Sequence, residues 1–115
     1  MRYFLIIFML VSSTAYASVD VDKMADAIFW AEGGYDTNFP YGIKSVTCRG
    51  YDDCRRICIN SIRNGYKRYQ SRRANDQRTF LEHFRDRYCP LSDSPLNSSW
   101  LRNVKWFLDN PKEIK

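Results

Sequence analysis

Residues 21–34 read VDKMADAIFWAEGG, and this stretch decides the fold of the chain. Its apolar residues recur every three or four positions, which is the spacing of one face of an α-helix. They are Val21, Met24, Ala25, Ile28 and Phe29. Asp20 precedes the run, as an N-cap does, and Gly33-Gly34 follow it, as glycines do beyond the C-terminus of a helix. We therefore predict an amphipathic first helix that ends near Glu32.

Three later segments show the same helical spacing. They run from a cap at Asp52-Asp53 to about Tyr69, from a cap at Thr79 to a stop at Cys89-Pro90, and from about Trp100 to Asn110-Pro111. Residues 33–51 are rich in turn-forming residues, and the alternation over 43–47 allows a brief strand. The sequence thus predicts an all-α domain of about four helices, with a loop or short hairpin after the first helix.

The N-terminal segment, residues 1–17, is typical of a signal peptide. Arg2 precedes an apolar run over residues 3–11, and Ala15-Tyr16-Ala17 fits a signal-peptidase site. The run is shorter than the roughly 20 residues that cross a bilayer. We expect a secreted or periplasmic domain over residues 18–115 with no stable membrane anchor; a buried N-terminal helix is the alternative.

The composition limits the function classes that remain. A chain of 115 residues holds one domain, which we expect to be monomeric, and its 16% aromatic content excludes a disordered chain. Its single histidine, His83, excludes sites that need several histidines. The net charge is +5, with basic residues gathered between Arg55 and Arg78. They form a solvated helix face or attract an anionic polymer or membrane surface, whereas nucleic acid does not fit an exported protein.

The four cysteines are predicted to form disulfides, because an even count in an exported chain indicates such bridges. Three pairings are possible, and we favour Cys48–Cys54 together with Cys58–Cys89. A four-thiolate zinc site is the competing interpretation. It is disfavoured because CxxxC spacing is looser than that of the usual zinc knuckle.

Glu32 is the candidate for chemistry. The carboxyl lies at the end of an apolar helix, after Trp30 and before a glycine-rich loop. Partial desolvation raises the pKa of a carboxyl group, and a raised pKa suits a general acid near neutral pH. The alternative is a helix-end glutamate that faces water.

Two stretches carry a resemblance to a known family. Residues 31–34 read AEGG and residues 40–43 read PYGI, which resembles the active-site region of the lysozyme superfamily, namely phage-type lysozymes and lytic transglycosylases. Residues 84–90, FRDRYCP, followed by Asn97, Trp100 and Asn103-Val104, are similar to the tail of small transglycosylase-like proteins. The resemblance implies a small lysozyme-like fold whose first core helix ends at the catalytic acid, here Glu32.

The resemblance also implies a substrate and its binding residues. The expected partner is a peptidoglycan glycan strand, cut at the MurNAc-GlcNAc bond without metal or cofactor. Tyr41 and Tyr88 are the candidates for lining the saccharide cleft or orienting the substrate, with Gly42 beside them, and Asn97 is the candidate for bonding an N-acetyl group. The two tyrosines are otherwise core aromatics, and Asn97 is otherwise the N-cap of the last helix; Asn97-Ser98-Ser99 is also a glycosylation sequon.

The chain departs from the family pattern at three places. Gly33 stands where transglycosylases usually place Ser, and Ile43-Lys44 where many have Met-Gln. The position of the second acid of phage-type lysozymes is Tyr41, and the nearest acid is Asp36. We therefore favour a single-acid lytic transglycosylase over a two-carboxylate hydrolase. A non-catalytic lysozyme-like binding module is the alternative, and an unrelated secreted effector or toxin is the third hypothesis.

Overall fold

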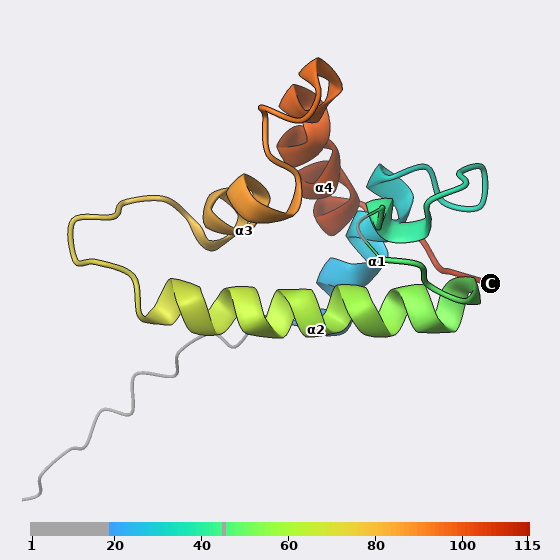
Figure 1. The fold of residues 1–115 in the computed structure, drawn as a ribbon, viewed down its shortest axis with the longest axis horizontal. Coiled ribbons are helices and arrows are strands. Elements are labelled where there is room, and N and C mark those ends of the chain that lie inside the picture. Colours follow the sequence, from blue (N-terminus) through green and yellow to red (C-terminus); the bar gives the residue numbers. More distant parts are fainter. Residues whose placement is uncertain (1–18, 45) are drawn as a thin grey trace, which may run out of the picture.

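Helix α1 (Val21–Ala31) lies at the centre of the fold, between α2 and α4 (Figure 1). The computed structural model describes residues 19–44 and 46–115. Five α1 residues are buried, and they form the middle of the core: Met24, Ala25, Ala27, Ile28 and Phe29. The predicted cap is confirmed, because the Asp20 carboxylate accepts the backbone N–H of Lys23 at 3.0 Å. The helix ends where Gly33 and Gly34 take positive φ angles, as predicted.

Helix α2 (Gly50–Gln70) is the long helix along one side of the molecule (Figure 1). The predicted cap at Asp52-Asp53 is wrong by about one turn, because Arg49 is the N-cap. The Asp53 carboxylate instead reaches back and accepts the backbone N–H of Arg49 at 2.8 Å. An acidic side chain in the first turn thus satisfies an unpaired N–H without itself being the cap.

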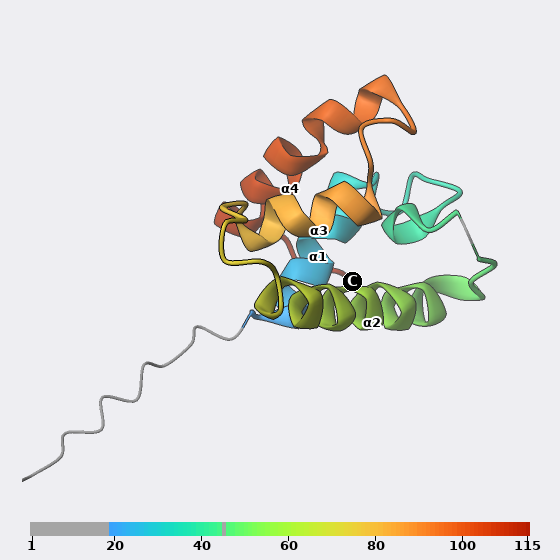
Figure 2. The same cartoon turned by 60° about the vertical axis from the view of Figure 1, so that its left-hand side comes forward.

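The C-terminal third contains α3 (Phe80–Tyr88), the 3-10 helix η2 (Pro95–Ser99) and α4 (Trp100–Asp109). Thr79 caps α3 as predicted, and its hydroxyl accepts the N–H of Glu82 at 3.2 Å. Ser99, and not Asn97, is the N-cap of α4. Figure 2 shows α3 between α2 and α4, and it packs on both helices.

The segment between α1 and α2 is a loop with one 3-10 turn, η1 (Pro40–Gly42). The brief strand allowed over residues 43–47 is not formed: the described residues of that stretch, and the rest of the described chain, contain no β-strand. Ile43 is buried, whereas Lys44 and Val46 are exposed. The alternation of apolar and polar residues therefore reflects a loop that the Ile43 side chain anchors to the core.

The second helix approaches α3 closely at a glycine. A Cβ at Gly65 would lie 2.8 Å from the ring of Phe84. The ring is buried and stacks on Tyr88 with a centroid distance of 4.9 Å. The all-α class is confirmed for the described residues: α2 and α4 pack on α1, and α3 packs on α2 and α4.

One of the two predicted disulfides is present. Cys48 and Cys54 form a disulfide that ties the loop to the first turn of α2, whereas Cys58 and Cys89 are free thiols. The predicted Cys58–Cys89 bridge is wrong: Cys89 lies beyond the end of α3 and lines the cleft as a free thiol. Tyr88, and not Cys89, is the residue that faces Cys58. Burial raises the pKa of Cys58 to about 12.

The predicted signal peptide, residues 1–17, lies outside the described residues. Among the helices that the structure describes, none has both the length and the apolar character needed to cross a membrane.

The disulfide gives a test of stability. Reduction, or the double substitution Cys48→Ser with Cys54→Ser, should lower the free energy of unfolding by about 2 kcal/mol, because a closed loop restricts the unfolded chain. Urea denaturation with and without reductant measures this difference. The matched control is Cys58→Ser with Cys89→Ser, which should stay sensitive to reductant. Insensitivity of the wild-type protein to reductant, or alkylation of a number of thiols other than two in the denatured but unreduced protein, would contradict the pairing.

Candidate active site

The Glu32 side chain lies where three elements meet. Glu32 caps the C-terminus of α1, and its backbone N–H bonds the Ile28 carbonyl at 3.0 Å. From α4, the indole N–H of Trp100 donates to Glu32 Oε1 at 2.7 Å. From η1, the backbone of Gly42 passes so close that a Cβ there would lie 2.5 Å from Glu32 Cδ. The carboxyl is therefore held by residues far apart in the sequence.

The environment raises the pKa of Glu32. The dominant cause is burial, which removes water from the charged form. The Trp100 hydrogen bond and the nearby charge of Lys44 act in the opposite direction and moderate the rise. The prediction of a partly desolvated carboxyl at the end of α1 is thus confirmed. The alternative, a glutamate that is fully exposed to water, is wrong.

The turn beside Glu32 is strained and held from outside. Tyr41 has a φ of 61°, in the left-handed region that a residue with a Cβ rarely adopts. The hydroxyl of Tyr88 donates to the Tyr41 carbonyl, and Arg55 Nη1 donates to the Tyr41 hydroxyl at 3.2 Å. Arg55 is itself anchored to Asp26 of α1 at 2.7 Å. These contacts hold Gly42 against the Glu32 carboxyl.

A cleft of about 520 Å³ opens beside Glu32, between α2, α3 and the η1 and η2 loops. Its volume lies within the range of about 300–1,000 Å³ that is typical of ligand sites. The lining is Glu32, Gly42, Ile43, Lys44, Ile57, Ser61, Asn64, Arg68, Phe84, Arg87, Tyr88, Cys89, Pro90, Asp93, Ser94 and Asn97. Polar and charged groups outnumber apolar ones along this wall, which suits a polar ligand.

Four of the five predicted site residues meet in this cleft: Glu32, Gly42, Tyr88 and Asn97. Asn97 also braces the wall, because its side-chain N–H donates to the Pro90 carbonyl at 2.7 Å. Tyr41 is the exception. Its side chain is buried and lies on a separate hollow with Phe29 and Tyr51, so the prediction that it lines the cleft is wrong. Its backbone turn, and not its ring, shapes the site.

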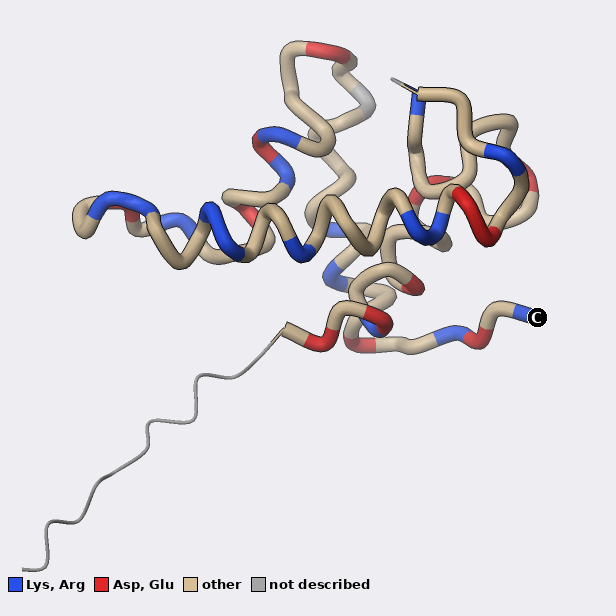
Figure 3. The backbone as a smooth tube through the Cα atoms, turned by 60° about the horizontal axis from the view of Figure 1, so that its bottom comes forward, with Lys and Arg blue, Asp and Glu red and all other residues tan. Residues whose placement is uncertain are grey.

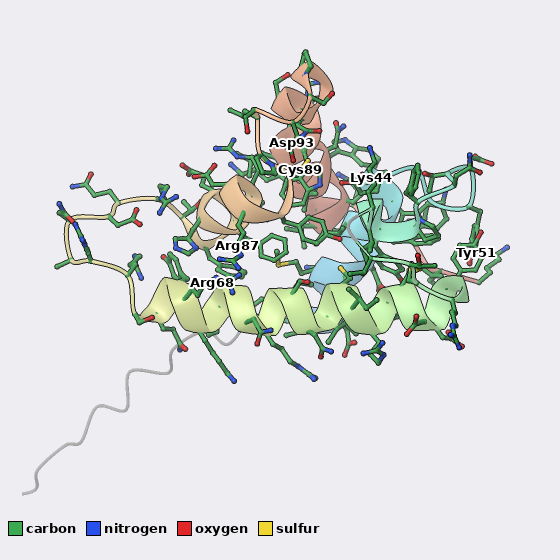
Figure 4. All side chains as sticks on the ribbon, viewed as in Figure 1. Lys44, Tyr51, Arg68, Arg87, Cys89 and Asp93 are labelled. Atoms are coloured by element: carbon green, nitrogen blue, oxygen red, sulfur yellow. A yellow bond between two sulfur atoms is a disulfide. The ribbon has the colours of Figure 1, made fainter. Side chains whose placement is uncertain are left out.

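Sequence reasoning missed every charged group of the cleft except Glu32, namely Lys44, Arg68, Arg87 and Asp93, and it missed the contact from Trp100. Figure 4 shows Arg68 and Arg87 between α2 and α3, and Lys44, Cys89 and Asp93 further along toward the loops. Arg68 and Arg55 were both expected on a solvated face. The only signal for Arg68 was its spacing from Ile57, Ser61 and Asn64, which places all four on one side of a helix.

Neither the free thiol nor the histidine supplies a second catalytic centre. Cys89 lines the cleft, and burial and the nearby Glu32 raise its pKa to about 11, so it is a neutral thiol. His83 packs its ring against Tyr69, at 5.7 Å between centroids, and is not among the lining residues. Within the described residues, no cluster of three or more His, Cys, Asp or Glu side chains is placed to hold a metal ion.

Substitutions at Gly42 and Gly50 distinguish the effect of contact with Glu32 from the effect of backbone strain. Gly42 and Gly50 both have positive φ, 72° and 76°, but a Cβ on Gly50 would meet nothing within 4 Å. We expect Gly42→Ala to displace the Glu32 carboxyl and shift its pKa, measured by NMR titration of the carboxyl carbon. Gly50→Ala should carry only the cost of the left-handed backbone, about 1–2 kcal/mol, and leave that pKa in place. Equal effects of the two substitutions would contradict the contact.

The raised pKa of Glu32 predicts a pH dependence of stability. Folding favours the protonated form, so ionisation of Glu32 destabilises the folded state as pH rises from the ordinary Glu value through the raised one. Relative to wild type, Glu32→Gln should therefore become more stable between about pH 4 and pH 7. Urea denaturation at both pH values measures the difference, with Glu113→Gln on the exposed C-terminal segment as control. A difference that stays flat or decreases with pH would show that burial does not penalise this carboxylate.

Comparison of the chain with protein-family models, with curated proteins and with solved structures finds no match. The functional argument therefore rests on the geometry of the cleft.

Proposed function

We propose that this chain is an exported enzyme that cleaves the glycan strands of peptidoglycan, with Glu32 as its single acid and base. The observation that carries the proposal is the Glu32 carboxyl itself: it is half-buried, has a raised pKa and lies on the wall of a polar cleft of about 520 Å³. The resemblance of residues 31–34 and 40–43 to lytic transglycosylases selects the substrate class.

The hydrogen bond from Trp100 supports an acid role for one particular oxygen. An indole N–H only donates, so Oε1 must accept. The carbonyl oxygen of a neutral carboxylic acid is the better acceptor, so this contact favours the proton on Oε2. A side chain at position 42 would collide with both oxygens, because a Cβ there would lie 2.6 Å from Oε2 and 2.7 Å from Oε1. Glu32 can thus present its proton to a glycosidic oxygen bound in the cleft.

The reaction then needs no second carboxylate. Glu32 gives its proton to the glycosidic oxygen as the bond from the anomeric carbon to that oxygen breaks. The 6-hydroxyl of the same sugar attacks the anomeric carbon, and the Glu32 carboxylate takes the proton which that hydroxyl loses. The enzyme returns to its starting state, no water is consumed, and the products are a shortened glycan and a 1,6-anhydro sugar end.

The cleft also supports a second reaction. Asp93, on the loop after α3, lines the same cleft as Glu32 and supplies the second carboxyl that the sequence did not place. A hydrolase would use such a group to activate water or to stabilise the charged sugar. The products distinguish the two reactions, because hydrolysis adds one water to each broken bond and leaves a reducing end.

Glu32→Gln tests the enzyme. We expect the release of soluble fragments from peptidoglycan to fall about 100-fold or more, because glutamine accepts the Trp100 hydrogen bond but has no proton to give. Mass spectrometry of the fragments should show anhydro-sugar ends. Asp36→Asn, an exposed acid of the neighbouring loop, is the matched control and should retain wild-type release.

The remaining outcomes select between the alternatives. Reducing ends that disappear with Asp93→Asn would replace the transglycosylase by a hydrolase. Binding of peptidoglycan without release, equal in wild type and Glu32→Gln, would replace the enzyme by a non-catalytic binding module.

A further inference from the structure

One face of α2 forms the floor of the cleft. Ile57, Ser61, Asn64 and Arg68 are spaced four, three and four residues apart, and all four line the cleft. At 1.5 Å per residue this stripe is about 16 Å long. The Glu32 charge acts on the thiol of Cys58, so the acid lies near the Ile57 end of the stripe. Arg68 lies at the opposite end.

Arg87 of α3 joins Arg68 at that far end. Figure 4 shows the two side chains next to each other between the helices, and both line the cleft. Arg68 is half-buried, and its desolvation and the charge of Arg87 both lower its pKa. The two guanidinium groups therefore repel each other, and Arg68 is partly withdrawn from water.

The described residues provide no carboxylate for this pair. Four other arginines form ion pairs with aspartates, namely Arg55, Arg56, Arg78 and Arg85, whereas neither Arg68 nor Arg87 has an ion pair within residues 19–44 and 46–115. The acidic groups of α3 are used elsewhere: Asp86 pairs with Arg78 at 2.8 Å, and Glu82 bonds the Thr79 hydroxyl at 2.9 Å.

Two adjacent unpaired guanidinium groups favour a carboxylate between them. Their planar N–H donors match the two oxygens of that group, and an anion removes the repulsion between the cations. The distribution of charge also favours an anion at this end of the cleft. Basic residues recur along the C-terminal half of α2 and the loop that follows it (Figure 3).

We propose that the Arg68–Arg87 end of the cleft binds a carboxylate of the ligand. This inference rests on the proposed function for its source: in peptidoglycan the carboxylate belongs to the stem peptide attached to the glycan. A glycan held at Glu32 would direct its peptide along the α2 stripe, past Ser61 and Asn64, to the two arginines. The cleft then recognises the peptide-bearing strand and discriminates against neutral chitin-like chains.

Binding of defined probes tests the site without turnover. The purified protein is titrated by calorimetry with a stem tetrapeptide, with the same peptide whose carboxylates are amidated, with acetate and with chitotetraose. We expect the double substitution Arg68→Gln with Arg87→Gln to weaken binding of the tetrapeptide about tenfold or more and to leave chitotetraose unchanged. Amidation should weaken binding to wild type by a similar factor.

Two variants serve as controls. Arg63→Gln, an exposed position of α2 outside the cleft, should bind the peptide as wild type does. Arg87→Gln alone, at an exposed position, keeps the test valid if the double variant does not fold. Peptide affinity that is unchanged in the folded variant, or equal affinity for the amidated peptide, overturns the carboxylate site. Acetate binding as tight as that of the tetrapeptide overturns the stem peptide as its source.

The outcomes for this site and for the enzyme are separable. A protein that binds the tetrapeptide through Arg68 and Arg87 but releases no glycan contradicts only the proposed reaction. A protein that releases glycan through Glu32 but binds the peptide independently of the arginines contradicts only the carboxylate site.

Discussion

The hydrogen bond from Trp100 to Glu32 is the contact on which the site depends. It joins the end of α1 to the start of α4 across 68 residues of sequence, and both partners lie at the edge of the core. Burying a carboxyl group costs free energy unless a donor satisfies it. The indole N–H supplies that donor but adds no charge, so the carboxyl stays in place while its pKa remains raised. A cation in the same position would have held the group ionised.

The wall on the other side of Glu32 is equally constrained. Gly42 approaches the carboxyl directly after Tyr41, which takes an unfavourable left-handed conformation. Two contacts from other helices offset that cost: Tyr88 bonds the Tyr41 carbonyl, and Arg55 bonds its hydroxyl. Strain of this kind persists only where the surroundings determine it, and it is concentrated at functional sites. Four helices therefore contribute to the position of one carboxyl group.

The cleft has different chemistry at its two ends. Near the loops lie both acids, Glu32 and Asp93, together with Lys44. In the last turns of α2 and α3, Arg68 and Arg87 provide only positive charge. The uncharged stripe of α2 between them carries hydroxyl and amide groups. Such a wall is suited to an extended polar ligand that carries an anionic branch, and this links the proposed reaction to the proposed carboxylate site.

Much of this architecture was predictable because it is local. Helical spacing, the caps at Asp20 and Thr79, the glycines after α1, the acid at its end and the short-range Cys48–Cys54 bridge all depend on residues within a few positions of one another. The predictions that were wrong concern direction in space. The ring of Tyr41 is buried in the core and does not line the cleft. Cys58 lies against Tyr88 and not Cys89, and the described residues of the stretch 43–47 form no strand.

Sequence alone thus determined the all-α class, the place of Glu32 and most of the helix boundaries, because periodicity and capping are properties of neighbouring residues. Only the tertiary structure decided that Trp100 holds the acid, that the backbone of Gly42 passes beside it, and that Arg68 and Arg87 share its cleft. The physical reason is that these contacts join residues of different helices. Their geometry depends on how the helices pack, and no spacing along the chain encodes it.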